Sequence, residues 1–256
     1  MRIAAHVRHA TGAAGEVLVL DTRAGSWYVL NATGASFWEH WSRGRDLPQS
    51  LAAVAARHPE VAPTRVRADG EALLEHLAGL GLVDPVGTDP PTPATSAAAS
   101  DPPAAPASSR PAARVGSRGS GARHHRLLVV VAPVALLVAV LLVRLPFRWT
   151  HLIVGATRAR PWCRYGETVS GAEELMAAAC RAARRFPGRA ACMEISLAAV
   201  LLAAGRRHRL DWCLGALTDP YRFHAWVECA GRRWDPGFDP NVGEPHADDR
   251  VGVLRV

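Results

Sequence analysis

A long low-complexity stretch divides this chain of 256 residues into two parts. Residues 86–122 are mainly Pro, Ala, Ser and Thr, with Arg and Gly towards the end and almost no bulky apolar side chain. Such a composition cannot bury enough apolar surface to offset the entropy cost of ordering the chain. We therefore expect a disordered linker at 86–125 between two folded domains, 1–85 and 126–256.

The basic residues of the chain are all arginines, and the formal net charge is +7. Arg-only usage in an Ala-rich chain reflects coding bias as readily as selection for a polyanion, so we expect no nucleic-acid partner. The cysteines form no CxxC pair, so we expect no zinc site, no other metal and no cofactor. Their odd number, without an N-terminal signal sequence, indicates a reducing cytoplasm. The five are Cys163, Cys180, Cys192, Cys213 and Cys229.

The first domain is predicted to contain three strands followed by three helices, which is a winged-helix-like α+β arrangement. The expected strands are residues 3–7, 16–21 and 26–31. The expected helix caps are Asn31 or Thr33, Asp46 and Thr64, with Gly81 ending the last helix. Winged helices often bind DNA, but the third helix carries acidic residues beside Arg65 and Arg67. A mixed-charge helix suits a DNA major groove poorly.

The second domain is preceded by an apolar segment at residues 127–143. Its 17 residues fall short of the roughly 20 that a spanning helix needs, and Pro133 interrupts it. A span would also place the two domains on opposite sides of a membrane. We therefore interpret this segment as the first helix of the second domain in a cytoplasmic protein, and leave peripheral membrane contact through 127–143 open.

A strong chemical signal in the chain lies between residues 190 and 236. Cys192 opens an apolar helix that Gly205 ends. The unpaired N–H groups and the helix dipole at that position lower the pKa of a thiol. A lone cysteine in an apolar helix is more often a core residue, so this thiol needs an acid–base partner to count as a nucleophile. The other four cysteines have no histidine in a suitable element and are interpreted as structural.

His224 is the expected partner, in a strand that precedes a two-residue turn at Ala230 and Gly231. With that turn, Cys229 faces Arg232 and Asp235 lies on the same sheet face as His224, one diagonal step away. We expect Asp235 to hold the Nδ1–H group of the imidazole while Nε2 serves the thiol. A register slip of one residue would send Asp235 to the opposite face, and Asp239 is the alternative carboxylate.

The run WCLGALTDPYRFHAWVE, between a cysteine-bearing helix and a short strand with Asp, resembles the transglutaminase-like cysteine peptidases of lasso-peptide biosynthesis. These leader-removing B proteins imply a transglutaminase/papain-like α+β domain over about residues 144–256. By resemblance, Cys192 is the nucleophile, His224 the base and Asp235 the orienting carboxylate. Ile195 stands where the family commonly has Arg.

The runs VLDTRAGSWYVLNATGASFWEHW and ADGEALLEHLAGLGLVD resemble PqqD-like recognition elements, which bind leader peptides of ribosomally made natural products. In that family the leader adds as a strand beside the third strand and packs against the third helix. This places the groove between 26–31 and 66–77. We select Trp27, Val29, Arg67 and Leu74 as leader contacts, while Tyr28 and Leu30 fit the core equally well.

The two resemblances together imply a leader peptidase that binds a precursor's leader and cleaves it from the core peptide. The expected partners are the precursor peptide and a separate ATP-dependent, asparagine-synthetase-like cyclase. The linker would hold the bound precursor near the peptidase, or would act only as a spacer. Two other interpretations remain open: an acyltransferase or transglutaminase using the same three residues, and a non-enzymatic protein that presents the precursor.

Overall fold

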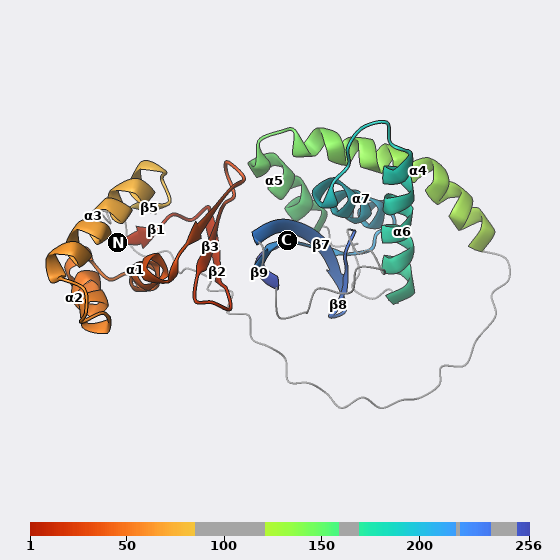
Figure 1. The fold of residues 1–256 in the computed structure, drawn as a ribbon. Helices are drawn as coiled ribbons and strands as arrows, with labels where there is room; N and C mark the ends of the chain where they lie inside the picture. The colour runs from red at the N-terminus through yellow and green to blue at the C-terminus, as the bar shows by residue number, and fades with distance from the viewer. Residues whose placement is uncertain (85–120, 159–168, 219–220, 237–249) are drawn as a thin grey trace, which may run out of the picture.

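The computed structural model describes residues 1–84, 121–158, 169–218, 221–236 and 250–256. They form two units, each built from an antiparallel sheet and helices, so the predicted α+β class is confirmed (Figure 1). The expected linker lies mostly outside the described residues. Helix α4 begins at Gly121, so residues 121–125 are helical.

The N-terminal sheet has three antiparallel strands in the order β2–β3–β4. These are Val7–Thr11, Val17–Asp21 and Ser26–Leu30. A strand predicted at 3–7 was wrong: residues 4–7 turn, with the Val7 N–H bonded to the Ala4 carbonyl at 2.9 Å. Instead β1 (Arg2–Ile3) pairs with β5 (Val83–Asp84), a contact between distant segments that local pattern does not contain.

Helix α1 (Ala32–Ser42) lies on one face of this sheet, and α2 (Leu47–Arg57) and α3 (Pro63–Gly79) pack against α1 and against each other. Asn31, rather than Thr33, caps α1, and Asp46 forms a capping box with Gln49. The predicted Thr64 cap was wrong: Ala62 is the N-cap, and Pro63 is the first residue of α3, where its fixed φ suits the helix. Gly81 takes φ +70 after α3, as a helix end requires.

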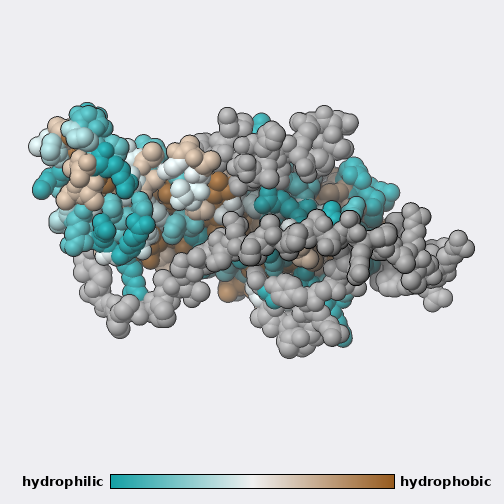
Figure 2. All heavy atoms as spheres, turned by 90° about the horizontal axis from the view of Figure 1, so that it is seen from below, coloured by the Kyte–Doolittle hydropathy of each residue, from teal (hydrophilic) through white to brown (hydrophobic). Residues whose placement is uncertain are grey.

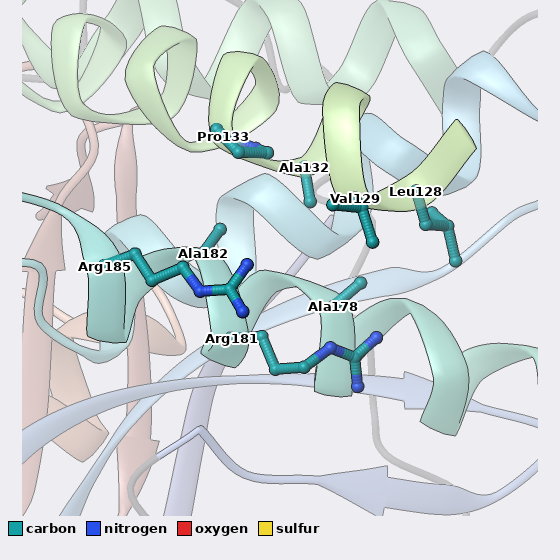
Figure 3. A pocket seen from close by; sticks show the side chains of 8 residues that line it. All are labelled: Leu128, Val129, Ala132, Pro133, Ala178, Arg181, Ala182 and Arg185. Atoms are coloured by element: carbon teal, nitrogen blue, oxygen red, sulfur yellow. The ribbon is translucent and has the colours of Figure 1, made fainter. Parts of the chain in front are cut away.

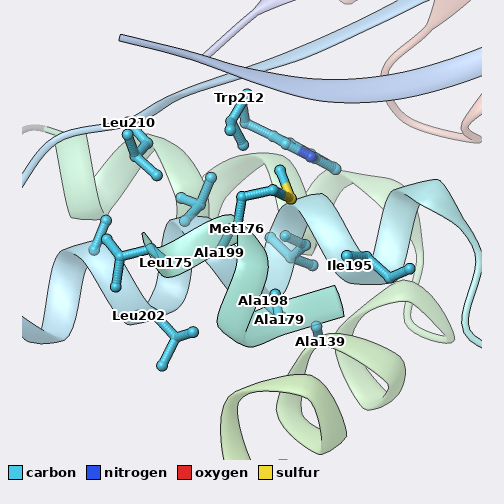
Figure 4. Close-up of a cluster of buried hydrophobic side chains, with 14 of the residues drawn as sticks. Ala139, Leu175, Met176, Ala179, Ile195, Ala198, Ala199, Leu202, Leu210 and Trp212 are labelled. Atoms are coloured by element: carbon cyan, nitrogen blue, oxygen red, sulfur yellow. The ribbon is translucent and has the colours of Figure 1, made fainter. Parts of the chain in front are cut away.

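The C-terminal unit surrounds α7 (Cys192–Gly205), which packs against α4 (Gly121–Val143), α6 (Val169–Arg185) and the sheet. Alanines at these contacts let the helices approach closely, and Trp212 closes the cluster from the sheet side (Figure 4). Helix α5 (Phe147–Arg158), which was not predicted, follows α4.

The C-terminal sheet is antiparallel, in the order β8–β7–β6–β9. The strands are β6 (Asp211–Thr218), β7 (Tyr221–Cys229), β8 (Arg232–Trp234) and β9 (Arg250–Arg255). Helix α7 packs directly against β7, the strand that carries His224. This contact brings the start of α7 to the middle of β7.

The two units touch through the N-terminal sheet face that carries no helices. Leu20 on that face is fully buried in the C-terminal core, and the Trp27 ring stacks on Phe223 with centroids 4.8 Å apart. Gly25 lies so close to α5 that a Cβ there would be 2.9 Å from the Cβ of Phe147. Polar residues dominate the opposite end of the molecule, formed by the N-terminal helices (Figure 2).

Candidate active site

Cys192 is the first residue of α7, and its side chain is half-buried. The Glu194 carboxylate turns back and accepts the Ala191 N–H at 2.9 Å, which fixes the chain entering the helix. One turn further on, Ser196 accepts the indole N–H of buried Trp212 at 2.9 Å. The thiol is therefore held at a rigid helix N-terminus and is still open to solvent.

The hairpin formed by β7 and β8 has the register that the sequence predicted. Cys229 faces Arg232 and Val227 faces Trp234. Ala230 and Gly231 both adopt positive φ, +50 and +76, as a type I′ turn requires. Asp235 follows β8 directly, on the same face as His224.

His224 and Asp235 are in contact: Nε2 lies 2.5 Å from Oδ1, and the two side chains are 15% and 11% exposed. The predicted nitrogen roles were wrong, because Nε2 rather than Nδ1 faces the carboxylate. Nε2 is the ring atom farther from the backbone, so it spans the diagonal to the next strand. Nδ1, nearer the backbone, is left for the thiol beside α7.

The Cys192 thiol is hydrogen-bonded to His224 and to the backbone N–H groups of Ala225 and Met193. Burial raises the pKa of this thiol, but these hydrogen bonds outweigh burial and bring its pKa below the usual value. Burial raises the pKa of Cys180, Cys213 and Cys229. Among the four cysteines that the structure describes, only Cys192 is activated.

The His224 imidazole has its pKa raised to about 9. Burial lowers this pKa, but the hydrogen bonds to Asp235 and Cys192 overcome the effect. The lowered thiol pKa and the raised imidazole pKa both favour transfer of the thiol proton to the imidazole, which gives a thiolate–imidazolium pair. Such a pair supplies a nucleophile and a proton donor together.

Trp226 and Gly215 shape the sheet beside the imidazole. The Trp226 ring is nearly parallel to that of His224, with centroids 6.4 Å apart. Gly215, on β6, faces His224 on the neighbouring strand β7. A Cβ at Gly215 would lie 2.1 Å from the Val251 carbonyl oxygen and 2.7 Å from the Trp226 ring. The sequence analysis missed Gly215, although a glycine inside a strand commonly marks a close backbone approach.

The residues selected for leader binding lie on two surfaces. Trp27 and Val29 point to the helix-free face of the N-terminal sheet, where they pair with Leu20 and Leu18. Arg67 and Leu74 lie on α3, Arg67 exposed and Leu74 half-buried against the domain core. Leu30 and half-buried Tyr28 belong to that core. Among the described residues β4 pairs only with β3, so its outer edge is free for another strand.

Metal ligands do not gather at this site: within the described ranges no group of three His, Cys, Asp or Glu side chains could hold an ion. Asp239, the alternative carboxylate, and Cys163 lie outside those ranges. In the described part of the chain, no helix combines the length and the apolar character that crossing a membrane requires.

Comparison with protein families matches residues 16–83 to coenzyme PQQ synthesis protein D (PqqD) and residues 135–248 to the transglutaminase-like superfamily. This chain is a PqqD domain fused to a transglutaminase-like domain. The fusion confirms the resemblance to the lasso-peptide B proteins, which combine these two domains. The transglutaminase-like domain is typical of cysteine-dependent enzymes.

Among solved structures, the chain is similar to "TbiB1 in Complex with the TbiA(beta) Leader Peptide", at 25% identity over 34% of this chain and 99% of the other. The TM-score is 0.32. No curated protein matches the chain.

Proposed function

We propose that this PqqD–transglutaminase fusion is a leader peptidase of lasso-peptide maturation. The observation that carries the proposal is the hydrogen-bonded series Cys192–His224–Asp235, in which the thiol pKa is lowered and the imidazole pKa is raised. A chain with such a series and a second domain of the leader-binding PqqD type suits the removal of a leader from a peptide.

The reaction begins with attack of the Cys192 thiolate on the scissile carbonyl carbon at the leader–core junction. The oxyanion that forms is stabilised by backbone N–H groups at the start of α7, including that of Cys192. The His224 imidazolium then donates its proton to the leaving amine, so the core peptide departs with a free N-terminus. Asp235 holds the ring in place and stabilises its charge.

Water completes the reaction. Neutral His224 takes a proton from water as the hydroxyl adds to the acyl-enzyme carbonyl, and the collapse of this adduct expels the Cys192 thiolate. The leader leaves with a carboxyl C-terminus. The same three residues would transfer the acyl group to an amine if an amine replaced water, so the leader's C-terminus distinguishes a peptidase from a transglutaminase.

The free edge of β4 provides the leader with a place to add as an extra strand. Val29, exposed beside this edge, and Trp27, stacked on Phe223, would contact its outward side chains, and Arg67 and Leu74 those facing α3. Phe223 immediately precedes His224. A leader bound on β4 would thus lie next to the strand that carries the base.

The proposal includes a cytoplasmic setting and two partners. The first is the precursor peptide, whose leader the PqqD domain would hold. The second is an ATP-dependent, asparagine-synthetase-like cyclase that would receive the freed core N-terminus.

The decisive experiment incubates the Cys192→Ala variant with a precursor peptide and analyses the products by mass spectrometry. Cleavage is expected to disappear while precursor binding remains. The control is Cys229→Ala, a half-buried cysteine on β7 with a raised pKa, which should cleave normally. Cleavage retained by Cys192→Ala would refute the nucleophile assignment, and an amide rather than a carboxyl terminus on the leader would favour acyl transfer.

A further inference from the structure

Helix α4 is apolar on every side, but only one side is covered. Its inner face packs into the C-terminal core through buried residues. These are Leu128, Ala132, Ala135, Leu136, Ala139 and Val140. Since this face is part of the domain core, α4 is fixed to the surface of the protein.

The outer face of α4 carries a row of exposed aliphatic side chains, between 50% and 69% exposed. They are Val130, Val134, Leu137 and Leu141, which helical spacing places in one line. Further along the chain, Leu145 between the two helices and Trp149 and Leu152 on α5 are also exposed. We call these seven residues the apolar stripe. In Figure 1, α4 runs along the outside of the C-terminal unit, and no described helix or strand lies beyond it.

An exposed row of this length is unusual for a soluble surface. Surface helices normally have one apolar face turned to the core and a polar face turned to water. Contiguous exposed apolar patches mark sites of interaction with a partner or a membrane.

Arginines border the stripe. Arg181 and Arg185 of α6 line a shallow pocket with Val129 and Pro133 of α4 (Figure 3). Arg144 and Arg148 are exposed and lie in the chain between Leu141 and Leu152 of the stripe. Within the described part of the chain none of these four forms an ion pair, and residues 121–158 include no Asp or Glu. These four arginines therefore place positive charge beside the stripe.

We propose that the apolar stripe and its arginine border bind peripherally to a membrane containing anionic lipids. The aliphatic row would enter the acyl region, while the guanidinium groups would contact lipid phosphates. Trp149 suits the boundary between the two, and the Arg148 guanidinium lies 5.8 Å from its ring centroid. Self-association is disfavoured, because pairing two copies through the stripe would bring their arginine borders together.

This surface does not include Cys192, His224 or Asp235, so the inference stands independently of the proposed peptidase activity. The test uses the full chain and flotation with vesicles of phosphatidylcholine alone or mixed with phosphatidylglycerol. Binding is expected only to the anionic vesicles and should weaken as salt is raised. The double variant Val134→Ser/Leu137→Ser is expected to bind at least about tenfold more weakly, since both side chains lose apolar area.

Two further variants complete the test. Arg144→Gln/Arg148→Gln should weaken binding to anionic vesicles with the aliphatic row intact. Leu80→Ser, an exposed apolar residue outside the stripe, should bind as the parent protein does. Circular dichroism of each variant confirms its fold. Absence of vesicle binding, equal binding by the stripe variant, or stripe-dependent dimers in sedimentation without lipid would each overturn the proposal, and dimers would identify the stripe as an interface between copies.

Discussion

The state of a thiol in this protein depends on its surroundings. Cys192 and Cys213 are both largely surrounded by protein, and burial alone raises the pKa of each. Only Cys192 gains hydrogen bonds from an imidazole and from backbone N–H groups, and these reverse the effect of burial. The sequence could suggest this environment through the helix position of Cys192, but not the N–H contributed by Ala225 on a distant strand.

Alkylation with iodoacetamide measures this difference directly. At mildly acidic pH Cys192 should react far ahead of Cys180, Cys213 and Cys229, because it alone has a lowered pKa. His224→Gln should slow its alkylation at that pH by about tenfold or more, since the imidazolium no longer stabilises the thiolate. Peptide mapping by mass spectrometry provides the rates. Equal labelling rates of these four cysteines in the native protein would contradict the lowered pKa of Cys192.

Asp235→Asn should narrow the pH range of activity. The Asp235 carboxylate helps to raise the His224 pKa to about 9, so the imidazolium persists up to that pH. Without the carboxylate the His224 pKa falls, so the alkaline limb of the activity profile should move to a lower pH than in the parent protein. The measurement is kcat/KM against pH. Glu228→Gln, which removes a carboxylate not in contact with His224, is the control and should keep the parent profile.

At the scale of elements, local pattern predicted what depends on near neighbours. The Ala230–Gly231 turn determined which residues pair, and with them the position of Asp235. The Asn31 and Asp46 caps were also visible in sequence. Pattern did not predict β1, which pairs with β5 some 80 residues away, nor the Nε2–Asp235 contact, which depends on side-chain direction. These features follow from tertiary packing.

Gly215 offers a test of how the sheet supports His224. Gly215→Ala would place a Cβ 2.1 Å from the Val251 carbonyl oxygen, and backbone cannot yield as a side chain can. The variant should lose about 1–3 kcal/mol of unfolding free energy. Gly252→Ala is the matched control, because a Cβ there meets the Trp226 ring only at 3.6 Å, an ordinary contact. Urea denaturation compares the two, and equal stability would show that β9 is not held by this close approach.

At the scale of the whole molecule, the PqqD domain rests against the C-terminal sheet, where β2 and β3 contact β9 and Trp27 stacks on Phe223 of β7. The contact also includes Leu20, Gly25 and Trp27 on one side and Phe147 and Phe223 on the other. The sequence indicated both domains but not this contact, because neither domain's pattern contains the other's surface. In the proposed function, this contact would direct a leader bound on β4 towards Cys192.

Phe223→Ala tests that idea. Loss of the Trp27 stack should leave leader binding unchanged, because Phe223 is not part of β4, but should lower kcat/KM for the whole precursor several-fold as the domains lose their alignment. Fluorescence anisotropy gives the leader affinity, and chromatography gives the cleavage rate. Trp27→Ala should also lower kcat/KM, but it should weaken leader binding as well, because Trp27 is also a proposed leader contact.

The control substrate is a short peptide that includes the cleavage site but lacks the part of the leader that the PqqD domain would bind. Its cleavage does not depend on domain alignment, so Phe223→Ala should process it at the parent rate. An equal loss on both substrates would mean that Phe223 acts on its neighbour His224 within β7. Loss confined to the whole precursor requires that the leader reaches Cys192 along the aligned domains, because only that substrate engages both.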